Sequence, residues 1–480
     1  MFSLDRNSPV PLADQIEARL RALIKGGQLP AGAKLTSIRT LAGQLGVSPN
    51  TVVTAYDRLV AAALIDSRGT AGFFVCEAAG SVPLDALLEA GEEQDAIWLV
   101  QQSHDMRAGV LPVSSGALPV SWLEDAIPAT VVQRGLARSG GGMASRCPTQ
   151  GLPELRERLS MLMRGQGIAV DASRVMTTWG GTHAIDLICR AFLQPGDTVL
   201  VENPGYFLLF DRLRRAGVQM LPIARRPDGP DLGELEAACI EHRPKLLFIQ
   251  SVLHNPTGWG SSAANLHRVL LLAERHGFLV AEDDVQGHFH AGPVTRLAQL
   301  SELRGVIYYS SFCKALSPAL RLGYLAAAPA LLKPLMREKI HSVMTTGALN
   351  EFVLLELLAS GRFRKHIDRL QQRLAAARGQ ASRLLRQAGI LLDHPGEGGL
   401  FLWGAVPHGA DLELLVKDAY RNGILLARNA AFTADGSGHS HSRFNVIFSQ
   451  NERLAQYLTP RLSALSSART VLARASAVAK

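Results

Sequence analysis

The feature that most constrains the fold is an alternation, from Val175 onward, between short apolar runs and segments of helical length. This alternation is typical of a mainly parallel β-sheet covered by helices. The runs end in chemically versatile residues, as in RVMTTWGGTHA, TVLVENPGY, KLLFIQSVLHNPTG, FLVAEDD and GVIYYSSFCK. Ligands of open α/β sheets bind at the carboxyl ends of the strands. We therefore expect five strand ends to converge on one site.

Length and composition set the class of protein. The chain has 480 residues, too many for one hydrophobic core, so we expect two or three domains. No apolar stretch reaches the roughly 20 residues of a membrane span, and the first residues lack a secretory pattern. The five cysteines are scattered, which favours reduced thiols in the cytoplasm and predicts neither a disulfide framework nor a metal site. The net charge of +8 fits an anionic partner such as nucleic acid, although many proteins without one are equally basic.

The first eighty residues predict three helices and a hairpin. An apolar face begins at Leu12 and ends before Gly26, and a short helix capped by Thr36 or Ser37 ends at Leu45. Ser48 is expected to cap a third helix, which should bury Val52, Val53, Tyr56, Leu59 and Val60 and expose Asn50, Thr51, Thr54 and Arg58. This arrangement matches helix-turn-helix geometry, in which the last helix presents its first turn to the major groove.

The stretch DSRGTAGFFV then predicts a two-stranded wing. Arg39 and Arg68 add positive charge, Arg68 within reach of phosphates, and Gly72 allows a close backbone approach. The structural alternative is an ordinary three-helix packing module without a nucleic-acid role. The wing and the basic residues favour DNA binding over that alternative.

The segment from Gly27 to Val75 resembles the winged helix of the GntR regulators along its whole length. The resemblance implies contact with operator DNA, and the residues expected to make it, with Arg68 added for its charge, are Arg39, Ser48, Asn50, Thr51, Arg68 and Gly72. Pro49 departs from the family, which often has arginine there, so the operator sequence cannot be transferred.

The strand ends of the second unit carry the groups that pyridoxal 5′-phosphate (PLP) needs. Lys314 can form a Schiff base with an aldehyde, and Asp283 can hold a pyridinium nitrogen protonated. Gly180-Gly181-Thr182 opens a helix whose N-terminus suits a phosphate, and Ser311 and Arg321 can complete the pocket. Each residue alone has an ordinary structural interpretation, such as a cap or a turn. Their order along the chain favours the cofactor site.

Residues 113–449 resemble the fold-type I aminotransferases through TQGLPELRERL, GGTHAIDL, VENPGY, HNPTG, AEDD, SSFCKALSPALRLGYLA and SRFNVIFS. The resemblance implies that Lys314 carries PLP and that Arg443 binds the carboxylate of an amino-acid ligand. It further implies that the cofactor is bound by Gly181, Thr182, Tyr206, Asn255, Asp283, Ser311 and Arg321. A winged helix fused to such a domain resembles the MocR subgroup of GntR regulators.

The resemblance also implies the domain organisation. We expect a winged helix-turn-helix domain over residues 1–77, a linker over 78–110, an aminotransferase-like domain over 111–465 and a flexible tail over 466–480. The aminotransferase-like part divides into a large α/β domain of mostly parallel sheet at 111–333 and a smaller α/β domain at 334–465. The strands of the smaller domain are expected in GGLFLWGAV, GILLARNAAF and RFNVIFS. A homodimer is expected because such sites are completed between subunits.

Two departures from the aminotransferase pattern bear on activity. Val285 and Gln286 stand where a tyrosine usually contacts the phenolic oxygen of PLP, and Arg146 stands near a usual aromatic position, where it could bind phosphate or an acidic ligand group. Two functions follow. We favour a DNA-binding transcriptional regulator that senses PLP or an amino compound; the alternative is an active aminotransferase with an auxiliary DNA-binding domain. The sequence leaves open the target genes, the effector, the direction of regulation and whether transamination occurs.

Overall fold

The computed structural model describes residues 4–6, 8, 10–25, 28–30, 32–62, 64–67, 71–76, 98–101, 109–138, 146–394, 396 and 398–462. The chain forms two compact units, Met1–Glu92 and Glu93–Lys480. Most of the expected linker, all of the expected tail and Arg68 lie outside the described residues. The finer domain boundaries therefore stay predictions.

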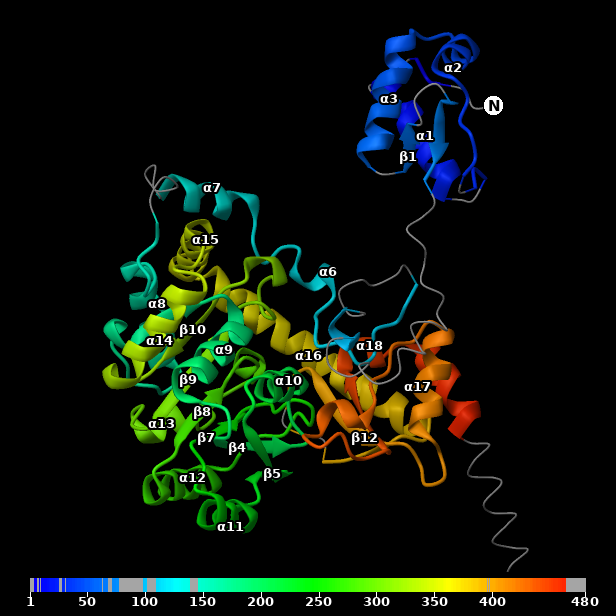
Figure 1. Cartoon of the computed structure of the whole chain (residues 1–480). Helices are drawn as coiled ribbons and strands as arrows, with labels where there is room; N and C mark the ends of the chain where they lie inside the picture. The colour runs from blue at the N-terminus through cyan, green and yellow to red at the C-terminus, as the bar shows by residue number, and fades with distance from the viewer. Residues whose placement is uncertain are drawn as a thin grey trace, which may run out of the picture. The chain divides into compact units, whose positions relative to one another are not determined.

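The N-terminal unit contains three helices, α1 (Leu12–Lys25), α2 (Ile38–Leu45) and α3 (Pro49–Ala61), and a hairpin of β1 (Ile65–Ser67) and β2 (Phe73–Val75) (Figure 1). The strands pair antiparallel with Asp66 opposite Phe74. Ile16, Val52, Tyr56 and Leu59 are fully buried in one small core. The predicted winged arrangement is thus present in the described part of this unit.

The predicted caps of α2 and α3 are confirmed. The Ser37 hydroxyl accepts from Thr40 N at 3.3 Å, and the Ser48 hydroxyl accepts from Thr51 N at 3.2 Å. Each bond satisfies one of the backbone donors that a helix N-terminus leaves free. Gly46 ends α2 with a φ of +62°, a conformation that glycine adopts without steric cost.

Val53, Val60 and Thr51 of α3 differ from the prediction, whereas Arg58 is exposed as expected. Val60 is 37% exposed, and Val53 and Thr51 are half-buried. The inward face of the helix consists of Val52, Ala55, Tyr56 and Leu59. The exposed Arg58 is not free, since it forms ion pairs with Asp14 and, at 3.8 Å, with Glu17 of α1.

The C-terminal unit is built on an eight-stranded sheet in the order β3-β10-β9-β8-β7-β4-β5-β6. Strands β9, β8, β7, β4 and β5 are parallel, whereas β10 runs antiparallel to both β3 and β9. The strands are β3 (Val175–Thr178), β4 (Thr198–Asn203), β5 (Gln219–Arg226), β6 (Gly229–Pro230), β7 (Leu246–Ile249), β8 (Leu279–Asp283), β9 (Val306–Ser311) and β10 (Gly323–Ala326). This confirms the predicted α/β class with a mostly parallel large sheet.

Helices cover both faces of this sheet (Figure 1). On one face α8 (Pro153–Gly165), α11 (Leu232–His242), α12 (Ala263–His276) and α13 (Leu297–Ser301) pack on residues such as Leu247 and Val280. On the other face α9 (Gly180–Phe192), α10 (Phe207–Arg215) and α14 (Pro329–Ser342) pack on residues such as Leu246 and Phe248. Successive strand residues thus face opposite layers, as a sheet buried on both sides requires.

Two further helices lead out of the large sheet. Helix α15 (Ala348–Ala359) packs against α7 (Ala129–Arg138) and α8, and α16 (Arg362–Gln387) runs on toward α18 (Val446–Ser449) (Figure 1). The buried Lys339 of α14 donates to Thr177 O at 2.8 Å, beside the buried Glu351 of α15, so the two helices are tied to β3 by charged groups. The short helix α6 (Val120–Leu123) precedes α7.

A second, three-stranded antiparallel sheet lies near the end of the chain, in the order β11-β12-β13. It consists of β11 (Leu391–Leu392), β12 (Phe401–Ala405) and β13 (His441–Asn445), with α17 (Leu412–Arg421) between the last two strands. The strand expected in GILLARNAAF is wrong. That segment pairs briefly with Leu111 through Ile424 and then forms the 3-10 helix Asn429–Phe432. Among the described residues, no helix is long and apolar enough to span a bilayer.

The cap of α3 generates a prediction. Replacing Ser48 by alanine removes the acceptor for Thr51 N and is expected to cost about 1 kcal/mol of local stability. Amide hydrogen exchange over residues 49–61, read by mass spectrometry, should then become about fivefold faster. Ser48→Asp keeps an N-cap acceptor and serves as the control. Equal exchange in the alanine variant and the wild type would show that the cap is energetically unimportant.

Candidate functional site

Five carboxyl strand ends lie along one edge of the large sheet. β3 leads into Gly180-Gly181-Thr182, β4 into Tyr206, and β7 into Gln250 and Asn255, while β8 ends at Asp283 and β9 leads into Lys314. Because β9, β8, β7 and β4 are parallel neighbours, these ends are adjacent in space. The sequence-predicted residues are therefore brought to one place.

Lys314 follows β9 and lies half-buried over the aromatic ring of Phe401, with its Nζ 5.7 Å from the ring centroid. Burial and the neighbouring charge of Arg443 lower the pKa of Lys314 to about 8, and Asp283 opposes the shift. A lysine with a lowered pKa has a larger unprotonated fraction near neutral pH. The free amine is the form that reacts with a carbonyl group.

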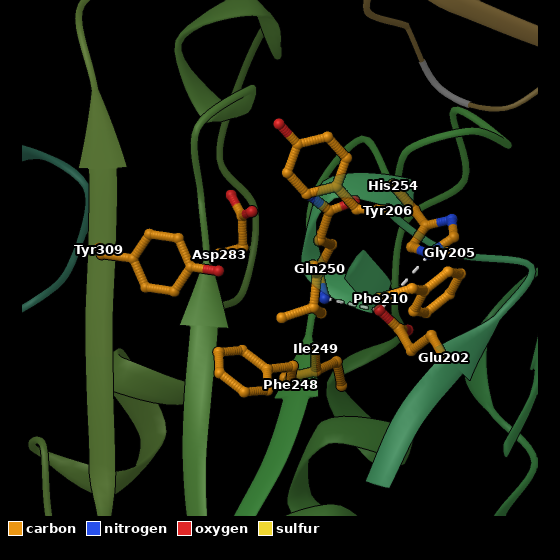
Figure 2. Close-up of a pocket in the computed structure, with 11 residues that line it drawn as sticks. Glu202, Gly205, Tyr206, Phe210, Phe248, Ile249, Gln250, His254, Asp283 and Tyr309 are labelled. Atoms are coloured by element: carbon orange, nitrogen blue, oxygen red, sulfur yellow. Dashed lines mark hydrogen bonds and ion pairs between the residues drawn. The ribbon is translucent and has the colours of Figure 1, made fainter. Parts of the chain in front are cut away.

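Asp283 is buried at the end of β8 and accepts from Val285 N at 2.9 Å. Burial raises the pKa of its carboxyl group, while the bond from Val285 N–H, a hydrogen bond from Gln250 and the charge of Lys314 oppose the rise. Figure 2 shows Asp283 between Tyr309 and Gln250, and the Tyr309 hydroxyl also hydrogen-bonds to it. A carboxylate held in this way favours a cationic partner, because the buried charge is otherwise only partly compensated.

Gln250 is a site residue that the sequence analysis missed. Its Oε1 accepts from Asn255 N at 2.7 Å, and its side chain also hydrogen-bonds to Asp283. Gln250 thus sets the relative positions of two predicted site residues. It directly follows the apolar run of β7, so the rule that strand ends carry the site could have found it.

A buried charged network lies behind Gln250. Glu202 accepts from Gln250 N at 2.7 Å and from Arg225, and His254 Nε2 lies 3.5 Å from it (Figure 2). Burial raises the pKa of Glu202 and lowers that of His254. Neutral His254 and the Glu202–Arg225 pair form a fixed support under the site, and they carry no exposed reactive group.

A tight cradle surrounds the N-terminus of α9, where no side chain caps the helix. A Cβ atom added to Gly181 would lie 2.9 Å from Val285 Cγ2, and one added to Gly180 would lie 3.3 Å from Arg321 Nη2. Arg321 also donates to Trp179 O at 3.3 Å and adopts a φ of +44°, which is uncommon for a residue with a side chain. Ser311 is buried, and its Cβ lies 3.9 Å from the position of the added Gly181 Cβ.

The cradle continues to Tyr206, which precedes α10. The Tyr206 hydroxyl and Thr182 are hydrogen-bonded, and burial together with Asp283 raises the pKa of Tyr206 to about 12. Tyr206 therefore stays protonated at neutral pH. Its ring lies above Gln250 and beside Asp283 in Figure 2, where a planar aromatic ligand could stack on it.

Arg443 comes from β13 of the smaller sheet and is buried at the same site. Its Nη1 donates to Asn255 Oδ1 at 2.7 Å and its Nη2 donates to Ser114 O at 2.6 Å, whereas its Nε is buried without a partner among the described residues. The guanidinium carbon lies 4.4 Å from the ring centroid of Phe401 and 4.8 Å from that of Phe432. Burial lowers the pKa of Arg443 to about 9, because its charge has lost contact with water. An anionic ligand would stabilise this buried charge.

This set of residues fits PLP. The uncapped N-terminus of α9 suits a phosphate, and Arg321 lies beside it with a positive charge. The buried carboxyl group of Asp283 suits a pyridinium nitrogen, and the amide nitrogen of Asn255 stays available because Arg443 uses only its oxygen. The part of the chain that the structure describes contains no cluster of metal-ligating side chains.

The two departures from the aminotransferase pattern take distinct places. Val285 packs against the Gly181 position, so an apolar group occupies the edge of the cradle. Gln286 is buried, and neither of its amide atoms has a partner among the described residues. Arg146 is exposed and lies 3.9 Å from Met344 Sδ, outside the group around Lys314.

In the N-terminal unit the predicted DNA-contacting residues gather around the start of α3. Arg39, Ser48 and Asn50 are exposed and Thr51 is half-buried, while Ser48 and Thr51 share a hydrogen bond of 2.8 Å. Gly72 of the wing has a φ of +101°, and an added Cβ would lie 3.3 Å from Lys34 Cε. The glycine thus permits the close approach of Lys34 to the wing.

Family comparisons match both units. Residues 108–458 match the family of aminotransferases class I and II, and residues 12–75 match the bacterial regulatory proteins of the gntR family. The HTH-type transcriptional regulator YdcR of Escherichia coli is 28% identical over 92% of this chain and 96% of its own length. The probable rhizopine catabolism regulatory protein MocR of Rhizobium meliloti is 27% identical over 78% of this chain and 76% of its own.

Similar enzymes cover a smaller share of this chain than YdcR does. The 2-aminoadipate transaminase of Thermus thermophilus is 30% identical over 73% of this chain and 88% of its own length. The crystal structure of LysN, the α-aminoadipate aminotransferase of the same species complexed with N-(5′-phosphopyridoxyl)-L-leucine, superposes with a TM-score of 0.71 at 26% identity, covering 79% of this chain and 97% of LysN. The chain belongs to the aminotransferase class I and II family and, through its N-terminal gntR-family domain, has the architecture of the MocR subgroup of regulators.

Proposed function

We propose that this protein is a transcriptional regulator that binds operator DNA through α3 and the wing, and that it responds to an amino compound bound with PLP at the Lys314 site. The observation that carries the proposal is the joint presence, in one chain, of an exposed α3 N-terminus and a site in which the half-buried Lys314 lies near the buried Asp283 and Arg443. Operators recognised by winged helices are commonly paired half-sites, and a homodimer would match them.

Each group at the site has a task that follows from its surroundings. PLP, when bound, supplies an aldehyde that reacts with amines and a pyridine ring that withdraws electrons. Lys314 offers an amine with a lowered pKa, Asp283 holds a proton on the pyridine nitrogen, and the α9 N-terminus with Arg321 binds the phosphate. Arg443 binds the ligand carboxylate through its guanidinium group.

Arg443 also suggests how ligand binding is sensed. It belongs to β13 of the smaller sheet, whereas Asn255, Asp283 and Lys314 belong to loops and strands of the large sheet. A ligand that bridges Arg443 and the Lys314 region would favour the conformation in which the two sheets are held together. A ligand shifts such an equilibrium only through its different affinity for the two states.

The second candidate function is transamination. It is favoured by the retained Lys314 and Asp283 and by the similarity to 2-aminoadipate transaminase. Val285 and the unpartnered Gln286 weigh against it, because neither side chain replaces the acidic phenol of a tyrosine near the PLP oxygen.

The first prediction from the proposed function concerns Lys314. Lys314→Ala should abolish the visible absorption band of lysine-linked PLP, because no amine remains at that position. The variant should still bind a DNA fragment selected by the wild-type protein from a random pool. Its DNA affinity should no longer change when amino compounds are added, which fluorescence anisotropy would measure.

The same spectra separate the two functions. Conversion of the bound cofactor to pyridoxamine phosphate by one amino compound would establish transamination. A stable spectral change without conversion, accompanied by altered DNA affinity, fits the regulator. Retention of the visible band in Lys314→Ala would disprove the role of this lysine.

The second prediction concerns the charge of Asp283. Its raised pKa means that this carboxyl group costs folding free energy, fully at any pH above the folded-state pKa. The cost decreases as the pH falls below that value and vanishes below the unfolded-state pKa. Asp283→Asn removes the charge, so the PLP-free variant should melt no lower than the PLP-free wild type. Its affinity for PLP, measured by fluorescence titration, should fall at least about tenfold. A lower melting temperature with unchanged PLP affinity would contradict both roles of this carboxyl group.

The third prediction concerns Arg443. Arg443→Gln should weaken binding of an amino acid to the PLP-loaded protein by about tenfold to a hundredfold, because a charge-assisted hydrogen bond is lost. The amine obtained by removing the α-carboxylate from the same amino acid serves as the control, and its affinity should change little. Spectral titration measures both. Equal losses for the two compounds would indicate general damage to the site rather than carboxylate recognition.

A further inference from the structure

A second pocket lies away from the Lys314 site, between the end of α8, the loop 287–296 and the start of α16. Its volume is about 690 Å³, within the usual range for small-molecule sites. It is lined from three separate stretches of the C-terminal unit, with α13 adding Gln299. None of the lining residues belongs to the PLP cradle.

The polar lining of this pocket favours an anion. Arg296, Arg364, His288 and His290 line it together with three glutamines, and the lining contains no carboxylate. Asp284 neutralises Arg296 at 2.8 Å, but the exposed Arg364 has no ion-pair partner among the described residues. Arg364 is therefore the uncompensated cation of the pocket.

Two polar atoms of the lining lack partners. His288 is 5% exposed, and its Nε2 is buried without a hydrogen bond among the described residues. Gln166 Oε1 is also buried without a hydrogen bond among these residues. Burial lowers the pKa of His288 to about 4, so its ring is neutral and can donate one hydrogen bond. Unpaired buried polar atoms are costly unless a ligand or water satisfies them.

The remaining lining is apolar. Phe363 and Ile367 of α16 line it together with Met161 and Leu162 of α8. Val294 of the loop 287–296 also belongs to the lining. Such a surface gains from contact with a hydrocarbon or aromatic group. The pocket thus combines an apolar wall with one free cation.

The pocket also touches the elements that carry the cofactor residues. Asp284, which holds Arg296 and accepts from Tyr308 at 2.6 Å, directly follows Asp283. The His288 ring stacks on Phe312, two residues before Lys314, with 5.4 Å between centroids. Two lining residues, Arg296 and His288, therefore contact side chains that neighbour Asp283 and Lys314 in the sequence.

We propose that this pocket is a second small-molecule site, separate from the PLP site, for a compound with an apolar body and an anionic group. The anion pairs with Arg364, and the apolar body contacts Phe363 and Ile367. The inference does not depend on the function proposed above, because none of the residues that carry it binds PLP or DNA.

Calorimetric titration of the PLP-loaded full chain with phenyl phosphate tests the site. One molecule should bind per chain, at least about tenfold more tightly than inorganic phosphate or phenol. Arg364→Glu should weaken this binding at least about tenfold. Lys365→Glu is the matched control, since it reverses an exposed charge at the next position of α16 outside the pocket, and it should change the affinity by less than about twofold.

The visible band of bound PLP is recorded in the same titration and should persist, which shows that the cofactor site is not the one being filled. Loss of that band on addition of phenyl phosphate would overturn the proposal, as would equal weakening in the two variants. Absence of binding to the wild type at millimolar concentration would overturn it as well.

Discussion

The Lys314 site is organised around a carboxylate that the fold buries at the end of β8. Asp283 lies among strands whose side chains are apolar on both faces, so its charge can be kept only by directed partners. Gln250, Tyr309 and Val285 N–H supply them, and Lys314 adds a nearby positive charge. Glu202 of β4 is likewise buried and is compensated by the buried Arg225 of β5.

Much of this arrangement could be predicted from the sequence, because the residues with the chemistry of the site stand directly after the apolar runs that form the strands. The runs ending in Asp283, Asn255 and Lys314 are short, apolar and separated by helical segments, and these features alone place their ends together. The caps at Ser37 and Ser48 were predictable for a similar reason, since a capping residue acts on backbone atoms three positions away.

The remaining features depend on contacts that a linear pattern does not contain. The segment from Gly423 reads as a strand, but its backbone pairs with Leu111 only briefly before it coils. Gln250 looks like any polar residue after a strand, and its role follows from the positions of Asn255 and Asp283. Val60 is apolar and is therefore expected in the core, yet it is exposed, and Val52, Ala55, Tyr56 and Leu59 form the inward face of α3.

The ion pairs of Arg58 have a consequence for how the protein would search a genome. Each cation that contacts the DNA backbone lengthens the residence time of a protein at non-specific sites, because phosphate contacts carry no sequence information. Asp14 and Glu17 hold Arg58 against α1 and remove one such cation from the reading helix. A regulator built in this way would leave wrong sites sooner, and would depend on Arg39 and Asn50 to recognise the right one.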